Sequence, residues 1–210
     1  MMVVRTISGF TKETRNSDPK YENCNRSANE FGRVSSLCRQ VRVALYGILP
    51  TQNNLVVVNG FTKKMREVLT CDTTNPKGDR QLANALATPE GRQLLEGYGF
   101  NPDTTIALDY TLANNLLTIK PGNIIYPTGI NHIGFRVHEL AFDFATAESK
   151  LVSGDWVFGS GTINLAVPNL SNATGVLFTL LEAQFYDYAN GGYLPMANDR
   201  GKKVAVVEVG

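Results

Sequence analysis

Apolar and small residues between Asp18 and Pro50 recur every three or four positions, which predicts one long helix with a single buried stripe. The positions are Tyr21, Cys24, Ala28, Phe31, Val34, Cys38, Val41, Leu45 and Ile48. Asp18 is suited to cap the N-terminus, and Pro19 suits the first helical position, where its missing N–H has no cost. Pro50 ends the pattern, so the helix is expected over about 19–49.

Further helices are expected before residue 103. Helical spacing continues over about 52–69, although the β-branched run at 56–58 followed by Asn59-Gly60 also fits a strand and a turn. Two short helices are expected over about 79–87 and 89–96, the second because Thr88-Pro89 is a capping residue followed by proline.

From residue 104 the apolar period changes to two, which is typical of strands. Alternation on both sides of Asn114-Asn115 predicts a hairpin. The alternation in 132–145 slips by one residue between Val137 and Leu140, which predicts a β-bulge near His138-Glu139. Further strands are expected at 124–126, 156–158, 162–167, 176–188 (slipping at Leu180-Leu181), 193–196 and 202–209.

The order of these elements predicts an α+β fold in which N-terminal helices pack on a C-terminal antiparallel β-sandwich of seven to nine strands. The chain divides into an extended N-terminal arm (1–17), a helical region (18–102) and the β-sandwich (103–210), with the last two forming one folding unit. The arm contains a strand-like segment in which Val3, Val4, Arg5 and Ile7 are candidate contact residues. Such an arm pairs either with its own sheet or with the open edge of a neighbouring copy.

Composition excludes several classes of function. With 43% hydrophobic and 19% charged residues, the chain is ordinary for a folded domain, and its net charge of +1 gives no reason to expect nucleic acid. No apolar run is long enough to insert into a membrane, and no signal peptide is recognisable. A cytoplasmic location is expected, unless non-classical release or incorporation in a particle places the protein outside. Cys24, Cys38 and Cys71 are expected to be buried small hydrophobes.

Four segments carry a resemblance to other proteins: TRNSDPKYENCNRSANEFG (14–32), CDTTNPKGDR (71–80), GFRVHELAFDFATAE (134–148) and the closing stretch 180–209. They resemble uncharacterised proteins of similar length from Bacteroidota, which have a helical N-terminal half and a β-rich C-terminal half. The resemblance implies this architecture and a bacterial source. It implies no activity and no catalytic residue.

The sequence gives no catalytic, cofactor-binding or metal-binding assignment. His132 and His138 lie on one predicted strand, but their spacing puts them about 20 Å apart, too far to share one zinc ion. They are expected to be surface or edge histidines. Gly159-Ser160-Gly161 is no nucleophile elbow, and no glycine-rich phosphate loop is present. We therefore expect a protein that is not an enzyme and needs no cofactor.

Aromatic residues concentrate late in the chain, at Trp156, Phe158, Phe178, Phe185, Tyr186, Tyr188 and Tyr193, and a stacking platform for a sugar or a single strand of nucleic acid is one interpretation. Phe178 and Phe185 fall in the apolar phase of a predicted strand and are expected in the core. Tyr186, Tyr188 and Tyr193 are expected to face the other way, at a surface or an interface.

Two functional hypotheses follow. The first is a non-enzymatic structural protein that assembles with copies of itself into a filament, tube or phage-like particle, through strand exchange and helix–sheet contacts. Its interface would contain the arm, the three tyrosines and the polar face of the long helix, which carries Arg26, Arg33 and Arg39. The alternative is a binding module that recognises a glycan or a protein through the β-sandwich.

Overall fold

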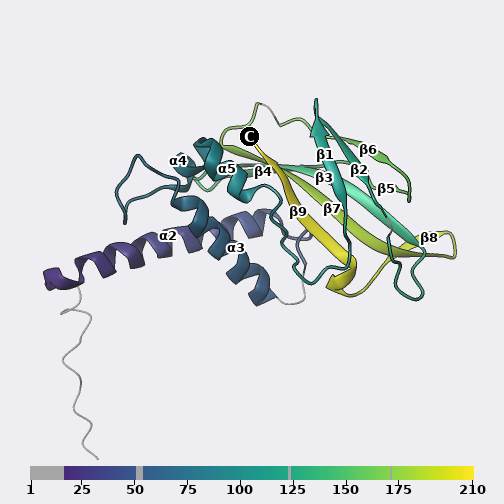
Figure 1. The fold of residues 1–210 in the computed structure, drawn as a ribbon, viewed down its shortest axis with the longest axis horizontal. Helices are drawn as coiled ribbons and strands as arrows, with labels where there is room; N and C mark the ends of the chain where they lie inside the picture. Colours follow the sequence, from purple (N-terminus) through teal and green to yellow (C-terminus); the bar gives the residue numbers. More distant parts are fainter. Residues whose placement is uncertain (1–16, 51–53, 123, 171) are drawn as a thin grey trace, which may run out of the picture.

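A computed structural model describes residues 17–50, 54–122, 124–170 and 172–210 (Figure 1). The helices come first, as predicted: η1 (Pro19–Tyr21), α2 (Glu22–Ala44), α3 (Asn54–Leu69), α4 (Leu82–Ala87) and α5 (Pro89–Leu95). The long helix ends at Ala44 rather than near 49, and turns follow it. Gly47 has φ +86°, a left-handed conformation that no helix continues through.

The strands form two antiparallel sheets. The larger has the order β4 (Ser149–Ser153), β3 (His132–Phe142), β7 (Val176–Ala189), β8 (Gly192–Pro195), with β5 (Val157–Phe158) also on β3 and β9 (Lys202–Val209) also on β7. The smaller has the order β1 (Asp109–Ala113), β2 (Leu116–Lys120), β6 (Ile163–Ala166). The predicted hairpin at Asn114-Asn115 is confirmed, and both residues have positive φ. Residues 124–126 form no strand.

The α+β class is confirmed, with helices in the N-terminal half and antiparallel strands in the C-terminal half. The β region is a curled six-stranded sheet with a separate three-stranded sheet, so the description as a β-sandwich is not confirmed. In Figure 1 the helices lie over the left end of the large sheet, and the small sheet lies at its upper right.

Two separate cores cover the two faces of the large sheet. One face, here called the helix-side face, carries Leu140, Phe142, Phe178 and Leu180, which pack with buried residues of α2, α3 and α5. The other face carries a second set of buried residues that packs against β2 and β6. Its members on β3 and β7 are Ile133, Phe135, Val137, Leu181, Ala183 and Phe185.

This arrangement corrects the predicted bulge at His138-Glu139. β3 pairs with β7 in one unbroken register from His132↔Tyr186 to Phe142↔Val176. The apolar pattern changes phase because the first half of β3 is buried by the small sheet and its second half by the helices. The same exchange of layers explains the slip predicted at Leu180-Leu181, because Leu180 belongs to one core and Leu181 to the other, and a register shift between β7 and β9 occurs next to it, between Thr179 and Leu180.

Buried polar groups tie the loop before α4 to the helices. Glu30 of α2 accepts hydrogen bonds from the Arg80 guanidinium (2.8 and 3.0 Å) and from the backbone N–H of Gly78 (2.9 Å). Asp72 accepts from three backbone N–H groups of the loop and from the Asn75 side chain. These hydrogen bonds outweigh burial, which alone would raise the pKa of Asp72, and they lower it to about 2.

Candidate functional site

The helices leave one half of the helix-side face uncovered. Leu140 and Leu180 lie under the helices, but the same face continues along β3 and β7 to Gly134 and Tyr186, which belong to neither core. In Figure 1, β8 and the adjoining ends of β3 and β7 extend to the right beyond the helices. Polar and aromatic residues gather on this part of the sheet.

Six rings form a layer on this half of the sheet, here called the ring cluster. Its members are His132, Trp156, Phe158, Tyr186, Tyr188 and Tyr193. Phe158 and Tyr193 stack in parallel, with centroids 3.7 Å apart and an angle of 6° between the rings. Tyr186 is buried beneath them, whereas Tyr188 and Tyr193 are 45% and 40% exposed. The cluster is therefore an aromatic layer with an exposed outer surface.

Gly134 makes room for the ring cluster. A Cβ atom at this position would lie 2.8 Å from Phe158, 3.1 Å from Trp156 and 3.1 Å from Tyr186. The rings of Phe158, Trp156 and Tyr186 can pack this close to the strand only because position 134 has no side chain. Glycine is needed at this position for the close approach of the rings, not for an unusual backbone conformation.

A buried carboxylate separates the ring cluster from the helix-covered core. Glu182 is 1% exposed and contacts three basic side chains: Arg136 at 2.8 Å, His138 at 2.9 Å and Lys202 at 2.7 Å. Burial alone would raise the pKa of Glu182, but the hydrogen bonds from these partners outweigh it and lower the pKa to about 2. Burial and the Glu182 charge together raise the pKa of Tyr186 to about 12. Arg136 also lies 4.6 Å from the centre of the Trp156 ring, a cation–π contact.

His138 connects this carboxylate to the edge of the sheet. Its Nε2 lies 2.9 Å from Glu182 Oε2 and its Nδ1 lies 2.7 Å from Ser153 Oγ. His138 is 0% exposed, so the expectation of a surface or edge histidine is wrong for this residue. The small sheet buries the other face of β3, and the helix-side face is packed on both sides of position 138.

A second exposed apolar surface lies where α2 and α3 approach each other, here called the helix-tip groove. It encloses about 490 Å³ and is lined by Arg39, Arg42, Val43, Tyr46, Gly47, Leu49, Pro50, Val57 and Val58. Tyr46 is 90% exposed, and Val43 is also exposed. The Nη1 atom of Arg42 is buried and has no hydrogen-bond partner among the described residues. Burial lowers the pKa of this guanidinium.

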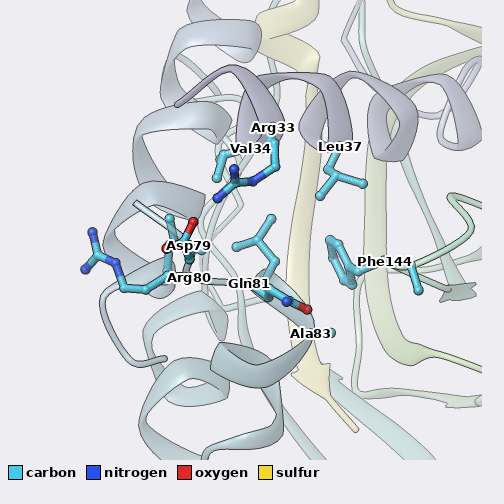
Figure 2. A pocket seen from close by; sticks show the side chains of 11 residues that line it. Arg33, Val34, Leu37, Asp79, Arg80, Gln81, Ala83 and Phe144 are labelled. Atoms are coloured by element: carbon cyan, nitrogen blue, oxygen red, sulfur yellow. The ribbon is translucent and has the colours of Figure 1, made fainter. Parts of the chain in front are cut away.

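A second concavity, of about 450 Å³, lies between α2, the start of α4 and the turn after β3 (Figure 2). Its apolar wall includes Leu37 and Phe144. Its polar rim is already paired: Arg33 donates to the Gly78 carbonyl at 2.6 Å, and Asp79 and Arg80 bind Arg26 and Glu30. These groups hold the loop on α2, so we interpret this pocket as structural.

The residues proposed from the sequence for an interface fall into four groups. Val3, Val4, Arg5 and Ile7 lie outside the described residues. Arg26 and Arg33 bind the 78–79 turn of their own chain, whereas Arg39 is exposed at the helix-tip groove. The three tyrosines lie together in the ring cluster, although Tyr186 is buried, which corrects its expected exposure.

Two further expectations need correction. The tyrosines were expected to face away from the core phenylalanines. They face away from Phe185 but share the helix-side face with Phe178, because these two phenylalanines belong to different cores. Cys38 is buried as expected, but Cys24 is exposed because the first turns of α2 extend beyond the packed layers.

The described residues were expected to include neither a metal site nor a membrane-spanning helix. Among the described residues no group of three or more histidine, cysteine or acidic side chains is placed to hold a metal ion. No described helix combines the length and apolar character needed to span a bilayer.

The sequence did not link Ser153, His138 and Glu182, and His138 was considered only as a metal ligand. They come from three strands, β4, β3 and β7, and only the pairing register brings them together. One signal was available in the sequence: polar residues at positions 136 and 138 occupy the phase that becomes apolar at 140 and 142. That signal marks a polar patch within a buried strand but does not identify its partners.

Comparison with protein-family models gives no match, and searches of curated proteins and of solved structures give none either. Function is therefore inferred from the geometry of the described residues.

Proposed function

We propose that this protein is a structural subunit that assembles head to tail, with the helix-tip groove of one copy binding the ring cluster of the next. The observation that carries this proposal is that one chain exposes two unlike apolar surfaces on different elements. Exposed apolar patches mark interaction sites. A contact between two different surfaces leaves one of each free, so it repeats into a filament or tube, or closes into a ring or shell.

The two surfaces are chemically complementary. The helix-tip groove offers two guanidinium groups, Arg39 and Arg42, and the ring cluster offers the exposed tyrosines Tyr188 and Tyr193. Arginine stacks favourably on aromatic faces, and the exposed side chain of Arg39 is available for such a contact. Tyr46 adds a large apolar side chain, of the kind enriched at the centre of interfaces.

Strand exchange is the second part of the proposed assembly. Among the described residues β4 pairs only with β3, and β8 only with β7, which leaves open edges on the large sheet. An open edge is a template for an added strand. We propose that the strand-like segment containing Val3, Val4, Arg5 and Ile7 pairs with such an edge on a neighbouring copy.

The test compares the particle mass of the native protein with that of three variants, by light scattering and negative-stain imaging. Tyr46→Ala and Tyr193→Ala each remove one surface, and both should reduce the particle to a monomer or a small oligomer. Ile125→Ala is the matched control, because Ile125 is an exposed apolar residue outside both surfaces. A native protein that is monomeric at micromolar concentration would overturn the proposal.

A second candidate function is glycan binding by the ring cluster. The observation that favours it is the partly exposed ring cluster, with Phe158 stacked on Tyr193 and Arg136 over Trp156 beside it. Sugar rings stack on such surfaces, and arginine donates to their hydroxyl groups. A glycan array probed with the Tyr46→Ala variant, in which the ring cluster is intact, tests this function. Binding that disappears in Tyr46→Ala/Tyr188→Ala would favour it over assembly.

A further inference from the structure

We propose that Ser153 is a nucleophile activated by His138 and Glu182, and that it accepts acyl groups from esters. The three side chains form a hydrogen-bonded row in which Ser153 Oγ lies 2.7 Å from His138 Nδ1, and His138 Nε2 lies 2.9 Å from Glu182 Oε2. A nucleophile, a base and a group that orients the base are the three parts of a covalent acyl-transfer site. This proposal goes beyond the assembly function and runs against the expectation that the chain is not an enzyme.

The low pKa of Glu182 determines where the protons lie among the three side chains. Because the Glu182 pKa is lowered to about 2, this side chain is a carboxylate at neutral pH and only accepts hydrogen bonds. His138 Nε2 must therefore carry the proton of the bond to Glu182. In the neutral ring Nδ1 then has a free lone pair, and it accepts the hydroxyl proton of Ser153.

In nucleophilic catalysis the attacking hydroxyl must be accessible to the substrate, whereas the base and the group that orients it can be buried. His138 and Glu182 are almost completely inaccessible, whereas Ser153 is exposed at the end of β4. The pairing of Ser153 with His138 across β3 and β4 holds the hydroxyl in place, and the N–H of Gly154 donates to the Val137 carbonyl directly beside it. Arg136 and Lys202 fix the Glu182 carboxylate, which in turn orients the imidazole.

The neighbouring residues indicate the substrate class. Arg136 and Trp156 occupy the same face of the sheet as His138, and Arg136 is only two residues from it, about 7 Å along the strand. Arg136 is half-buried and has more N–H donors than the two that bind Glu182, so it is available to a developing oxyanion. The ring cluster beyond it offers apolar surface. We therefore infer that the substrate is a carboxylic ester with an apolar or aromatic portion.

The reaction balances without a cofactor. Ser153 Oγ attacks the ester carbonyl carbon while its proton moves to His138 Nδ1, and a new Oγ–C bond forms. The bond from that carbon to the alcohol oxygen breaks, and His138 returns the proton to the leaving alcohol. Water then attacks the acyl-serine along the same proton path, which releases the carboxylic acid and restores the Ser153 hydroxyl.

The experiment uses the full-length Tyr46→Ala chain, so that its outcome does not depend on assembly. A fluorophosphonate probe reacts with an activated serine, forming an Oγ–P bond with loss of fluoride, and peptide mass spectrometry identifies the residue. We expect label on Ser153, none after Ser153→Ala, and unchanged label after Ser149→Ala, an exposed serine on the same strand. Absence of label on Ser153, or label on other serines alone, would overturn the proposal.

The role of His138 is tested with His138→Gln, after its fold has been verified by thermal unfolding. General-base assistance contributes about 100-fold or more, so labelling of Ser153 should slow by at least that factor. An unchanged labelling rate in the folded variant would refute the proton relay. If His138→Gln does not fold, the comparison of Ser153→Ala with Ser149→Ala still decides whether Ser153 is the nucleophile.

Discussion

Gly134 packs against the ring of Tyr186, and a Cβ atom at position 134 would lie 3.1 Å from that ring. The ring cluster therefore depends on the absence of a side chain near the start of β3. Because position 134 has no side chain, aromatic rings cover the half of the sheet that the helices leave free.

Gly134→Ala should destabilise the protein by about 1–3 kcal/mol, because the methyl group would also approach Phe158 to 2.8 Å and the rings would have to move. The control is Gly161→Ala, where a Cβ atom would meet nothing within 4 Å. Denaturant unfolding followed by tyrosine and tryptophan fluorescence measures both. Equal stability of the two variants would show that the rings do not pack on Gly134.

Acid should weaken the fold through Glu182. Its pKa is lowered from 4.5 to about 2 in the folded protein, so its contribution is present above the unfolded value and is lost as pH falls toward 2. The shift corresponds to about 3 kcal/mol. Unfolding midpoints at pH 7, 4 and 3 should fall for the native protein, and Glu182→Gln should remove part of that fall. Asp72 supplies another part, since its pKa is also about 2. An identical pH dependence in the variant would contradict this assignment.

Two ion pairs of α2 should differ sharply in strength. Arg80→Ala leaves the buried Glu30 carboxylate without its two-point partner and should cost about 3 kcal/mol. Arg26→Ala breaks an exposed pair with Asp79 and should cost less than about 1 kcal/mol. Thermal unfolding of both variants measures the difference. A larger loss for Arg26→Ala would mean that burial does not decide the strength of these pairs.

Deletion of residues 1–12 should leave the fold intact and reduce assembly. The proposed assembly places this segment on a neighbouring copy, so the unfolding midpoint of the single chain should not change. If the segment pairs with the open edge of a neighbouring copy, light scattering should report smaller particles than for the full chain. Particles of unchanged mass would rule out strand exchange by the arm.

Local patterns predicted the elements well because helices, strands and tight turns are encoded by neighbouring residues. The stripe from Val34 to Val41 and the turn at Asn114-Asn115 needed no tertiary information. The false bulge at His138-Glu139 has the opposite cause. Periodicity reports that the buried face changes, but it cannot tell a bulged strand from a regular strand covered by two different layers.

The candidate sites were less predictable because they depend on register between strands far apart in the sequence. Ser153, His138 and Glu182 are 15 and 44 residues apart, and only the pairing of β3 with β4 and β7 joins them. The three tyrosines lie on one face because Tyr186 and Tyr188 alternate on β7 and Tyr193 pairs with Tyr188, and their place at an interface stays a prediction. Their partners Trp156 and Phe158 reach them across Gly134, which no local pattern indicates.

Mixing two assembly-deficient variants tests the central proposal most directly. Tyr46→Ala keeps an intact ring cluster, and Tyr193→Ala keeps an intact helix-tip groove. Each alone should be unable to extend, but an equimolar mixture should form a 1:1 complex, because one complementary pair of surfaces remains. Light scattering of each variant and of the mixture would report this complex as a doubling of mass. Two monomeric variants that stay monomeric on mixing would contradict head-to-tail contact between these surfaces.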